Sequence, residues 1–434
     1  MADVDQHRLN NQHSDFSGSD FLSAREAATL LDVKLPTLYA YVSRGLVRSV
    51  AGAKGRPRRY ARADIERLKA RRDARRGHGA VAAGALRWGE PVLDSAITEI
   101  APSGHRYRGH GARELAAERS FEDVVELLWT GRLPDGPRLW DEQPDWATVA
   151  QINRLVPDDA GPLERLAALV PLMAVGDPDR HNLDDEVEMA RGRRLLVTMA
   201  AAVGPGPAGA DDSAAAASQP MAARLLRARV AAGAARRIPR GKLRAVERAL
   251  ILVADHELNV SAFAARVAAS AGSDLYSCVS AGLGALAGPL HGGMCERVEA
   301  LIHECQRPEQ VREVLRQRDR RGEEIPGFGH RLYPERGDPR TEPLLSCARQ
   351  LAGRNRQAAT VFALAEAMAA DRRQPPTVDI GLVALCSALR LRSRSAAAFY
   401  GVGRAAGWVA HSLEQRRAGF LLRPRARYVP DGPG

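Results

Sequence analysis

The sequence contains no uninterrupted apolar segment of the ~18 residues that a membrane-spanning helix needs. Its composition is 45% hydrophobic and 26% charged, which excludes a wholly disordered chain as well as an integral membrane protein. Residues 1–17 are polar and acidic, and they lack the basic and apolar regions of a signal peptide. We therefore expect a cytoplasmic protein.

Cysteine is also scarce. The five cysteines are odd in number and form no CxxC pair, so neither a disulfide framework nor a zinc knuckle is indicated. The sequence also lacks an HExxH motif and any tight cluster of histidine and aspartate. We expect reduced thiols, no metal site and no bound cofactor.

Positive charge is present in excess, and it is concentrated in one stretch. The net charge is +11, and the segment from Arg44 to Arg76 alone holds thirteen basic and three acidic residues. Such a block is typical of a surface that contacts a nucleic-acid backbone. On charge alone, a solvated helix face explains it equally well.

The pattern around this block favours nucleic acid. Ser23 and Glu26 have the spacing of a capping box and open an apolar-periodic segment. Residues 32–34 interrupt that helix, and apolar residues then recur at helical spacing from Leu35 until Gly45. A glycine-rich tip (51–55), a basic strand-like segment (56–60) and a third helix from Ala63 follow. Two short helices joined by a tight turn predict a helix-turn-helix.

Residues 20–76 resemble the MerR-type winged helix-turn-helix, which also occurs in excisionases. The resemblance implies DNA contacts from residues of the second helix and the wing, namely Lys34, Thr37, Tyr41, Arg44, Arg56, Arg58 and Arg59. Similar three-helix modules also dock onto proteins, and this alternative stays open.

The rest of the 434-residue chain reads as helix after helix, and a chain of this length holds two to four domains at ~100–200 residues each. Residues 77–90 are Gly/Ala-rich and predict a linker, and residues 204–220 predict a surface loop. Period-2 alternation is scarce and no internal repeat appears, so we predict an all-α body beyond the wing. Helices are expected at 120–129, 162–175, 242–258, 298–304, 360–371 and 377–391.

Three stretches of the body could carry chemistry. His291 lies in GPLHGG, His330 ends PGFGH, and Asp379 follows a Pro-rich turn just inside a predicted helix. Each has an ordinary explanation, because a histidine between glycines is commonly a turn residue and an early helical aspartate complements the helix dipole. Singly, none of them identifies a catalytic site.

Their order along the chain is more specific. GPLHGG, then PGFGHRLY with DPR, then the aspartate after the Pro-rich turn resemble the signature of the citrate synthase family. Residues 100–134, the DHELN element at 255–259 and the arginine segments at 403–415 and 421–428 fit the same family. The resemblance covers roughly residues 85–434. It implies a mainly α, two-domain helical body.

The family condenses acetyl-CoA with oxaloacetate and hydrolyses the citryl thioester. That reaction needs a carboxylate to remove a proton from the thioester methyl group and a donor to stabilise the enolate oxygen. By resemblance Asp379 is the base and His291 the donor, as a neutral imidazole. His330 matches the residue that polarises the keto carbonyl of oxaloacetate.

Binding of oxaloacetate requires planar cationic donors for its two carboxylates. By resemblance these are Arg340, Arg404 and Arg423, together with His256. In the family the last arginine reaches into the neighbouring subunit's site, which implies a homodimer. The segment 325–330, with Gly327 and Gly329, would contact CoA, and we assign Arg336 to its phosphates.

The chain departs from the family at several positions. Gly293 is followed by Met294-Cys295 where the family usually has Ala-Asn, and Asp379 is followed by Ile380-Gly381 where it usually has Phe-Tyr. One more residue than in many bacterial members separates His330 from Arg340. These changes bear on substrate choice, and propionyl-CoA, giving 2-methylcitrate, is an alternative.

Two functions are therefore expected for the chain. It is a citrate synthase-type enzyme with an N-terminal helix-turn-helix, or a DNA-binding regulator that uses the synthase body as a dimeric sensor. We predict a large domain at 85–295 and 386–434, with a small domain at 296–385 inserted into it.

Overall fold

The chain folds into two compact units. The computed structural model describes residues 21–31, 33–43, 46–50, 57–62, 64–66, 68, 93–101, 104–204, 219–230, 238–330, 332–333, 337–371 and 374–424. One unit comprises Met1–Asp94 with Arg423–Gly434, and the other comprises Ser95–Leu422. The predicted division of the body into a large and a small domain stays a prediction.

The first unit contains the predicted helix-turn-helix. Strand β1 (Phe21–Ser23) leads into α1 (Ala24–Leu31) and α2 (Leu35–Ser43), and β2 (Ser49–Val50) and β3 (Arg59–Ala61) follow. The antiparallel sheet has the order β1-β3-β2. The capping box is confirmed: the Ser23 amide donates to Glu26 Oε2 at 2.8 Å, and the Glu26 amide donates to Ser23 Oγ at 3.3 Å. Both helices and the sheet share one small apolar core.

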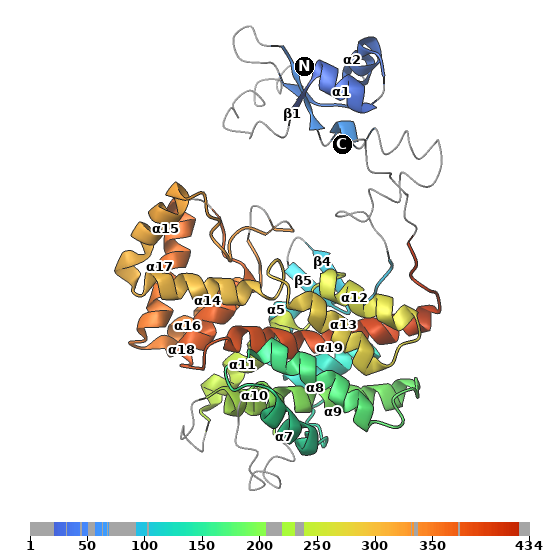
Figure 1. Cartoon of the computed structure of the whole chain (residues 1–434), viewed down its shortest axis with the longest axis vertical. Coiled ribbons are helices and arrows are strands. Elements are labelled where there is room, and N and C mark those ends of the chain that lie inside the picture. Colours follow the sequence, from blue (N-terminus) through green and yellow to red (C-terminus); the bar gives the residue numbers. More distant parts are fainter. Residues whose placement is uncertain are drawn as a thin grey trace, which may run out of the picture. The chain divides into compact units, whose positions relative to one another are not determined.

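The second unit is mostly helical (Figure 1). It begins with a three-stranded antiparallel sheet of β4 (Thr98–Ala101), β5 (Gly104–Tyr107) and β6 (His110–Gly111). The helices that follow are α5 (Ala112–Glu118), α6 (Phe121–Thr130), α7 (Trp146–Leu155), α8 (Pro162–Gly176), α9 (Asp185–Ala202), α10 (Met221–Arg229), α11 (Arg240–Val253), α12 (Val260–Ser270), α13 (Leu275–Leu286), α14 (Met294–Cys305), η2 (Pro308–Gln310), α15 (Val311–Arg320), α16 (Thr341–Ala352), α17 (Arg356–Asp371), α18 (Val378–Ala388) and α19 (Ser395–Ala418).

The predicted mainly α fold is confirmed, but the body is not helical throughout, because it begins with this small sheet. Strands β4 and β5 are four residues each and β6 is two, so the period-2 pattern is too short to stand out from the sequence. The sheet matters for the site because β5 carries His105 and Tyr107, which are both buried.

Helix α19 is the central element of the second unit. It is buried on every face over most of its 24 residues, and most of the buried side chains are small or apolar. In Figure 1 it runs through the unit in red, and α8, α9, α11, α12 and α13 all pack against it.

Helix α11 ends where α19 crosses it. A Cβ added at Gly407 would lie 2.4 Å from the Ala254 carbonyl oxygen, so only glycine permits this approach. The Gly407 amide donates to Ala254 O at 3.1 Å, and Arg404 Nε donates to Val253 O at 2.7 Å. Two carbonyl groups at the end of α11 thus accept hydrogen bonds from α19. This contact brings residues 255–256 next to Arg404.

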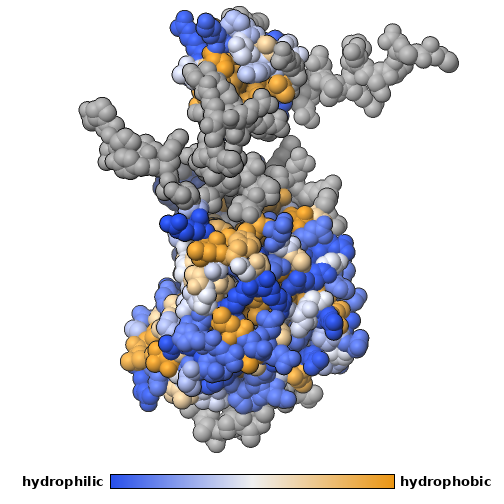
Figure 2. All heavy atoms as spheres, turned by 90° about the vertical axis from the view of Figure 1, so that its right-hand side faces the viewer, coloured by the Kyte–Doolittle hydropathy of each residue, from blue (hydrophilic) through white to orange (hydrophobic). Residues whose placement is uncertain are grey.

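Most of the described surface of the second unit in Figure 2 is hydrophilic, with separate apolar patches. No helix in the described ranges combines the length and the hydropathy needed to span a membrane. All five cysteines are buried free thiols.

Candidate active site

The first part of the candidate site follows the end of α11. Asp255 is fully buried and accepts hydrogen bonds from Thr98 Oγ1 at 2.6 Å and from His411 Nε2 at 3.3 Å. Its amide donates to Tyr107 Oη at 3.2 Å. These contacts fix the backbone of residue 255, and therefore the start of the loop that carries His256.

Three aromatic side chains surround His256. Its Nε2 lies 3.0 Å from Tyr333 Oη, and the rings of His105 and His330 pack edge-on against it at 5.7 and 5.6 Å. Burial, together with the positive charge of Arg340, holds the pKa of His256 well below its ordinary value. Burial likewise lowers the pKa of His105 to about 3 and lowers the pKa of His330. The cluster is therefore uncharged at neutral pH.

His291 occupies the turn between α13 and α14. Its Nε2 lies 2.9 Å from Ser261 Oγ, and its ring meets the Tyr400 ring edge-on at 6.2 Å. Burial, followed by the charges of Arg404 and Arg340, lowers the pKa of His291 to about 3. His291 is thus a neutral imidazole held by a neighbouring hydroxyl group.

Two buried arginines flank these histidines, and they differ in their partners. Asp338 binds Arg340 through two bonds, from Nε at 2.9 Å and from Nη2 at 2.7 Å. Burial opposes both charges, but the ion pair outweighs it, so the pKa of Asp338 falls to about 2 and that of Arg340 is raised. Asp338 also accepts from the Val378 amide at 3.1 Å, which ties the first turn of α18 to Arg340.

Arg404 has no carboxylate partner among the described residues. It is fully buried, its Nε donates to Val253 O, and its guanidinium carbon lies 5.1 Å from the centre of the Tyr400 ring. Its Nη1 and Nη2 are buried without a hydrogen bond in the described part of the chain, and so is Nη1 of Arg340. Burying a cation whose donors lack partners costs free energy, unless an anion accepts those hydrogen bonds. Free donors of this kind suit a small dianion.

Asp379 lies in the first turn of α18 and is buried. Its Oδ1 accepts from Cys295 Sγ at 3.1 Å, and its Oδ2 accepts from Thr377 Oγ1 at 2.9 Å. Burial raises the pKa of Asp379 in spite of these two bonds and the charge of Arg340. A buried carboxylate with a raised pKa is a stronger base than an exposed one.

The segment that we expect to contact CoA lies beside Asp379. Gly327 and Gly329 have φ angles of +86° and +74°, and a Cβ at Gly327 would lie 2.7 Å from Val298 Cγ2. The Thr377 amide donates to Gly327 O at 2.9 Å, and the Gly329 amide donates to Pro375 O at 3.0 Å. This backbone pairing fixes the loop against the turn that precedes Asp379. Arg336 lies outside the described residues.

The remaining predicted residues belong to the first unit. Arg423 is exposed and follows the last residue of the second unit. In the first unit, Lys34, Thr37, Arg58 and Arg59 are exposed, and Tyr41 packs partly against the core. Arg59 Nη2 also donates to Phe21 O at 3.0 Å. Arg44 and Arg56 lie outside the described residues.

Several site residues were not predicted as such. They are His105, Ser261, Cys295, Tyr333 and Asp338. Asp338 stands beside Arg340 in DPR and Ser261 follows the DHELN element, so motif proximity was an available signal for both. Cys295 follows GPLHGG by two residues, at a position where the chain departs from the family, so it carried a signal of the same kind. His105 was missed because its neighbours in the site are far away in the sequence.

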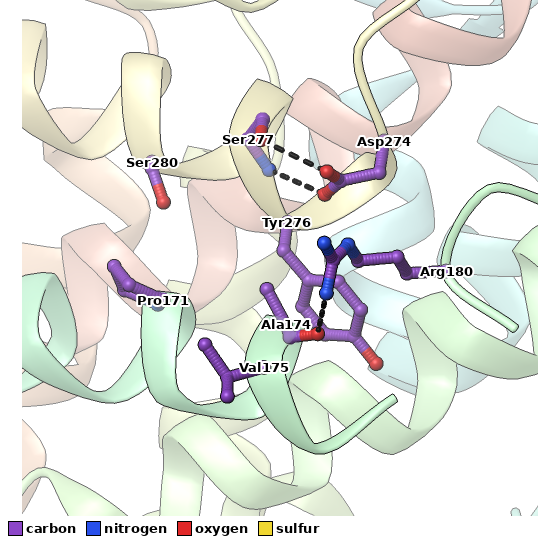
Figure 3. Close-up of a pocket in the computed structure, with 8 residues that line it drawn as sticks. All are labelled: Pro171, Ala174, Val175, Arg180, Asp274, Tyr276, Ser277 and Ser280. Atoms are coloured by element: carbon purple, nitrogen blue, oxygen red, sulfur yellow. Dashed lines mark hydrogen bonds between the residues drawn. The ribbon is translucent and has the colours of Figure 1, made fainter. Parts of the chain in front are cut away.

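A surface pocket lies elsewhere in the second unit, between α8 and α13 (Figure 3). Its polar groups bond to one another: Ser277 donates to Asp274 through its amide at 3.0 Å and its hydroxyl at 3.1 Å, and Arg180 Nη1 donates to Ala174 O at 3.0 Å. The pocket contains none of the residues described above. Its carboxylate, Asp274, already accepts both bonds from Ser277. The cluster of His256, His291, Arg340, Arg404 and Asp379 is the better candidate.

Comparison with known proteins gives two family matches. The model described as "Citrate synthase, C-terminal domain" matches residues 85–425, and the model described as "Helix-turn-helix domain" matches residues 21–73. The chain is 29% identical to "Citrate synthase 2" of Bacillus subtilis, over 79% of this chain and 95% of that protein. It is 30% identical to a "2-methylcitrate synthase" of Mycobacterium tuberculosis, over 78% of this chain and 88% of that protein.

Solved structures give the same result for the second unit. One is the citrate synthase from Thermoplasma acidophilum, solved as a ternary complex with carboxymethyl coenzyme A and oxaloacetate. It matches with a TM-score of 0.65 and 25% identity, over 79% of this chain and 95% of that chain. The citrate synthase from Pyrobaculum aerophilum matches with the same TM-score and identity, over 79% and 91% of the two chains.

Proposed function

The chain belongs to the citrate synthase family and is an enzyme of the citrate synthase type, and we propose that it condenses acetyl-CoA with oxaloacetate and hydrolyses the product to citrate and CoA. One observation carries the residue assignment. Arg340 and Arg404 present free buried guanidinium nitrogens beside neutral histidines and a buried carboxylate of raised pKa. This combination suits a dianionic keto acid and a weak carbon acid.

Oxaloacetate is bound first in this proposal. Its carboxylates accept hydrogen bonds from the free donors of Arg404 and Arg340, and His256 contributes a further contact. His330 donates to the keto oxygen and makes the keto carbon more electrophilic. Asp338 holds Arg340 in a fixed orientation. Less entropy is therefore lost when the substrate is oriented in the site.

Carbon–carbon bond formation then requires an enolate. Asp379 takes a proton from the methyl group of the thioester, and His291 stabilises the thioester oxygen by donating a hydrogen bond. The Ser261 hydroxyl donates to Asn259 Oδ1 at 2.7 Å and lies 2.9 Å from His291 Nε2. In this proposal the hydroxyl turns to His291 Nε2 when the thioester binds, which leaves the ring proton of His291 on Nδ1 for the enolate oxygen.

The enolate carbon attacks the keto carbon, and the keto oxygen takes up a proton. Water then cleaves the thioester, which releases citrate and the CoA thiol. In this proposal the family's two-subunit site also applies: Arg423 is exposed in its own subunit and would act in the site of a second one, as a homodimer allows. No step requires a bound cofactor other than the CoA substrate.

The test is the release of CoA thiol from purified full-length protein, followed with a thiol dye. We expect release that depends on oxaloacetate, with either acetyl-CoA or propionyl-CoA as the thioester. The relatives include enzymes named for both products, and an apolar pocket separates two substrates that differ by one methylene by only ~10–200-fold. The ratio of the two rates therefore shows which thioester is preferred, and so whether citrate or 2-methylcitrate is the main product. Absence of release with both thioesters, from protein that still binds oxaloacetate, would contradict the enzyme and favour the sensor.

The helix-turn-helix supports a second role, and we propose that the first unit contacts DNA. Lys34, at the turn between α1 and α2, and Arg58, before β3, are exposed cations on a module of the type that enters a major groove. Phosphate contacts release counterions, so binding weakens as salt concentration rises.

We therefore expect the full-length protein to bind a random-sequence DNA duplex in a salt-dependent manner. Each of Lys34→Ala and Arg58→Ala should lower the slope of log K against log salt by about 1, as expected for the loss of one phosphate contact. Fluorescence anisotropy at several salt concentrations measures both quantities. Arg154→Ala, which removes an exposed arginine from α7 in the second unit, is the control and should leave the slope unchanged. Absent or salt-independent binding would identify the module as a protein-docking unit.

A further inference from the structure

The two oxygens of the Asp379 carboxylate have different hydrogen-bond donors. Oδ2 faces the Thr377 hydroxyl at 2.9 Å, and Oδ1 faces the Cys295 thiol at 3.1 Å. All three side chains are buried. The donors come from different elements, since Thr377 immediately precedes α18 and Cys295 lies in the first turn of α14.

Thr377 can adapt to either protonation state of Asp379. Its Oγ1 lies 3.2 Å from Gly327 O as well as 2.9 Å from Asp379 Oδ2, but a hydroxyl has only one proton to donate. When Asp379 is ionised, that proton serves the carboxylate. When Asp379 is protonated on Oδ2, the proton of Thr377 can serve Gly327 O while its oxygen accepts from the acid. Thr377 therefore favours neither state strongly.

Cys295 cannot adapt in this way. Burial and the neighbouring Asp379 carboxylate raise the pKa of the Cys295 thiol well above its ordinary value, so the sulfur keeps its proton. A neutral, buried thiol beside a carboxylate is a poor nucleophile and a permanent, weak donor. Its hydrogen bond is strongest to the ionised carboxylate.

We propose that Cys295 is a positioning residue that holds the ionised carboxylate of Asp379 through its S–H group and so sets the acid limit of turnover. The proposal rests on the function proposed above, in which Asp379 is the base. The charged groups that act on Asp379 are Arg340, which lowers its pKa, and Asp338, which raises it. Neither is altered by a substitution at position 295, so a change at that position isolates the thiol.

The consequence of a weak donor can be tested by replacing it in two directions. Cys295→Ala removes the donor and should raise the pKa of Asp379, so the acid limb of log kcat moves to higher pH by about half to one unit. Cys295→Ser provides a stronger donor of similar size and should move the same limb to lower pH, or leave it in place. If Cys295 had only a structural role, the two variants would not move the acid limb of log kcat in opposite directions.

The pH profiles of wild type and both variants are measured by CoA release, with thermal melting to verify folding. Cys278→Ala is the matched control, because Cys278 is a buried thiol on α13 that has no contact with Asp379 or Cys295 among the described residues. It should leave the acid limb unchanged. Coincident limbs in wild type, Cys295→Ala and Cys295→Ser would overturn the proposal.

A second measurement does not depend on turnover. The Raman S–H stretching band of Cys295 is identified as the band that Cys295→Ala lacks, and it should lie at lower frequency than that of a free thiol. In Asp379→Ala it should move to higher frequency, because the acceptor has been removed. A band that does not respond would overturn the contact even if the enzyme is active. A responsive band in a protein that releases no CoA would retain the contact and contradict only the proposed function.

Discussion

Replacing Asp379 with asparagine is expected to reduce CoA release by about 10²–10⁴-fold, the usual contribution of a positioned general base. Asparagine has nearly the same shape as aspartate, and its amide oxygen can still accept from Thr377 or Cys295. It cannot take the proton from the thioester methyl group. The loss should therefore appear in kcat, measured by the thiol-dye assay at saturating oxaloacetate and acyl-CoA.

Binding of oxaloacetate should survive this change, because Arg340, Arg404 and His256 are untouched. Calorimetric titration with oxaloacetate checks this point. Asp371→Asn, at the exposed end of α17, removes a carboxylate that pairs with Arg312 at 2.5 Å and should leave turnover unchanged. Turnover of Asp379→Asn at the wild-type rate would show that another group is the base.

Arg404→Met is expected to weaken oxaloacetate binding by about 100-fold or more. Truncating one partner of a buried, hydrogen-bonded charge pair typically costs ~2–5 kcal/mol. The same change should not lower the thermal midpoint of the ligand-free protein. It loses one hydrogen bond to Val253 O, worth ~1 kcal/mol, but it also removes a buried charge whose Nη1 and Nη2 lack partners in the described structure.

Differential scanning calorimetry with and without oxaloacetate tests both effects. Wild type should be stabilised by the ligand, and Arg404→Met should not be, because ligand stabilisation follows affinity. Arg404→Lys keeps the charge without the planar fork and should bind poorly as well. Arg312→Met, at an exposed ion pair, is the control for loss of an arginine. Undiminished stabilisation of Arg404→Met by oxaloacetate would exclude Arg404 from the binding site.

Arg340 should behave differently from Arg404 for a reason that the structure makes plain. Asp338 already neutralises it, so removing Arg340 leaves a buried carboxylate without its partner. A variant at that position would lose stability together with binding. Arg404 is therefore the more informative arginine to change.

Local signals predicted much of the fold. The capping box of Ser23 and Glu26 located the first helix, and the apolar period gave α8 at 162–176 against the predicted 162–175. Such signals act between neighbouring residues, so they can be read from one sequence. Helix α11 shows where they fail: it ends at Val253 rather than 258, because Val253 O and Ala254 O bond to α19 instead of continuing the helix.

The ordered motifs brought His256, His291, His330, Arg340, Arg404 and Asp379 into the set of candidates. The structure gathers them, but their supporting contacts depend on tertiary packing. Cys295 and Asp379 are 84 positions apart, and His105 reaches His256 from a strand too short to show a period. No spacing rule connects such pairs. The sequence could therefore indicate the candidate residues but not the side chains that contact them and shift their pKa values.

The burial of every cysteine has a practical consequence. Thiol reagents attack the thiolate, and burial raises the pKa of Cys278 to about 12 and of Cys305 to about 11. Burial also raises the pKa values of Cys295 and Cys386 well above the ordinary value of a thiol. The native chain should therefore remain silent toward the dye that detects released CoA. Without substrate, slow labelling would then report how often the helices open. The same reagent therefore measures two rates: the release of CoA during turnover and, without substrate, the local opening of the fold.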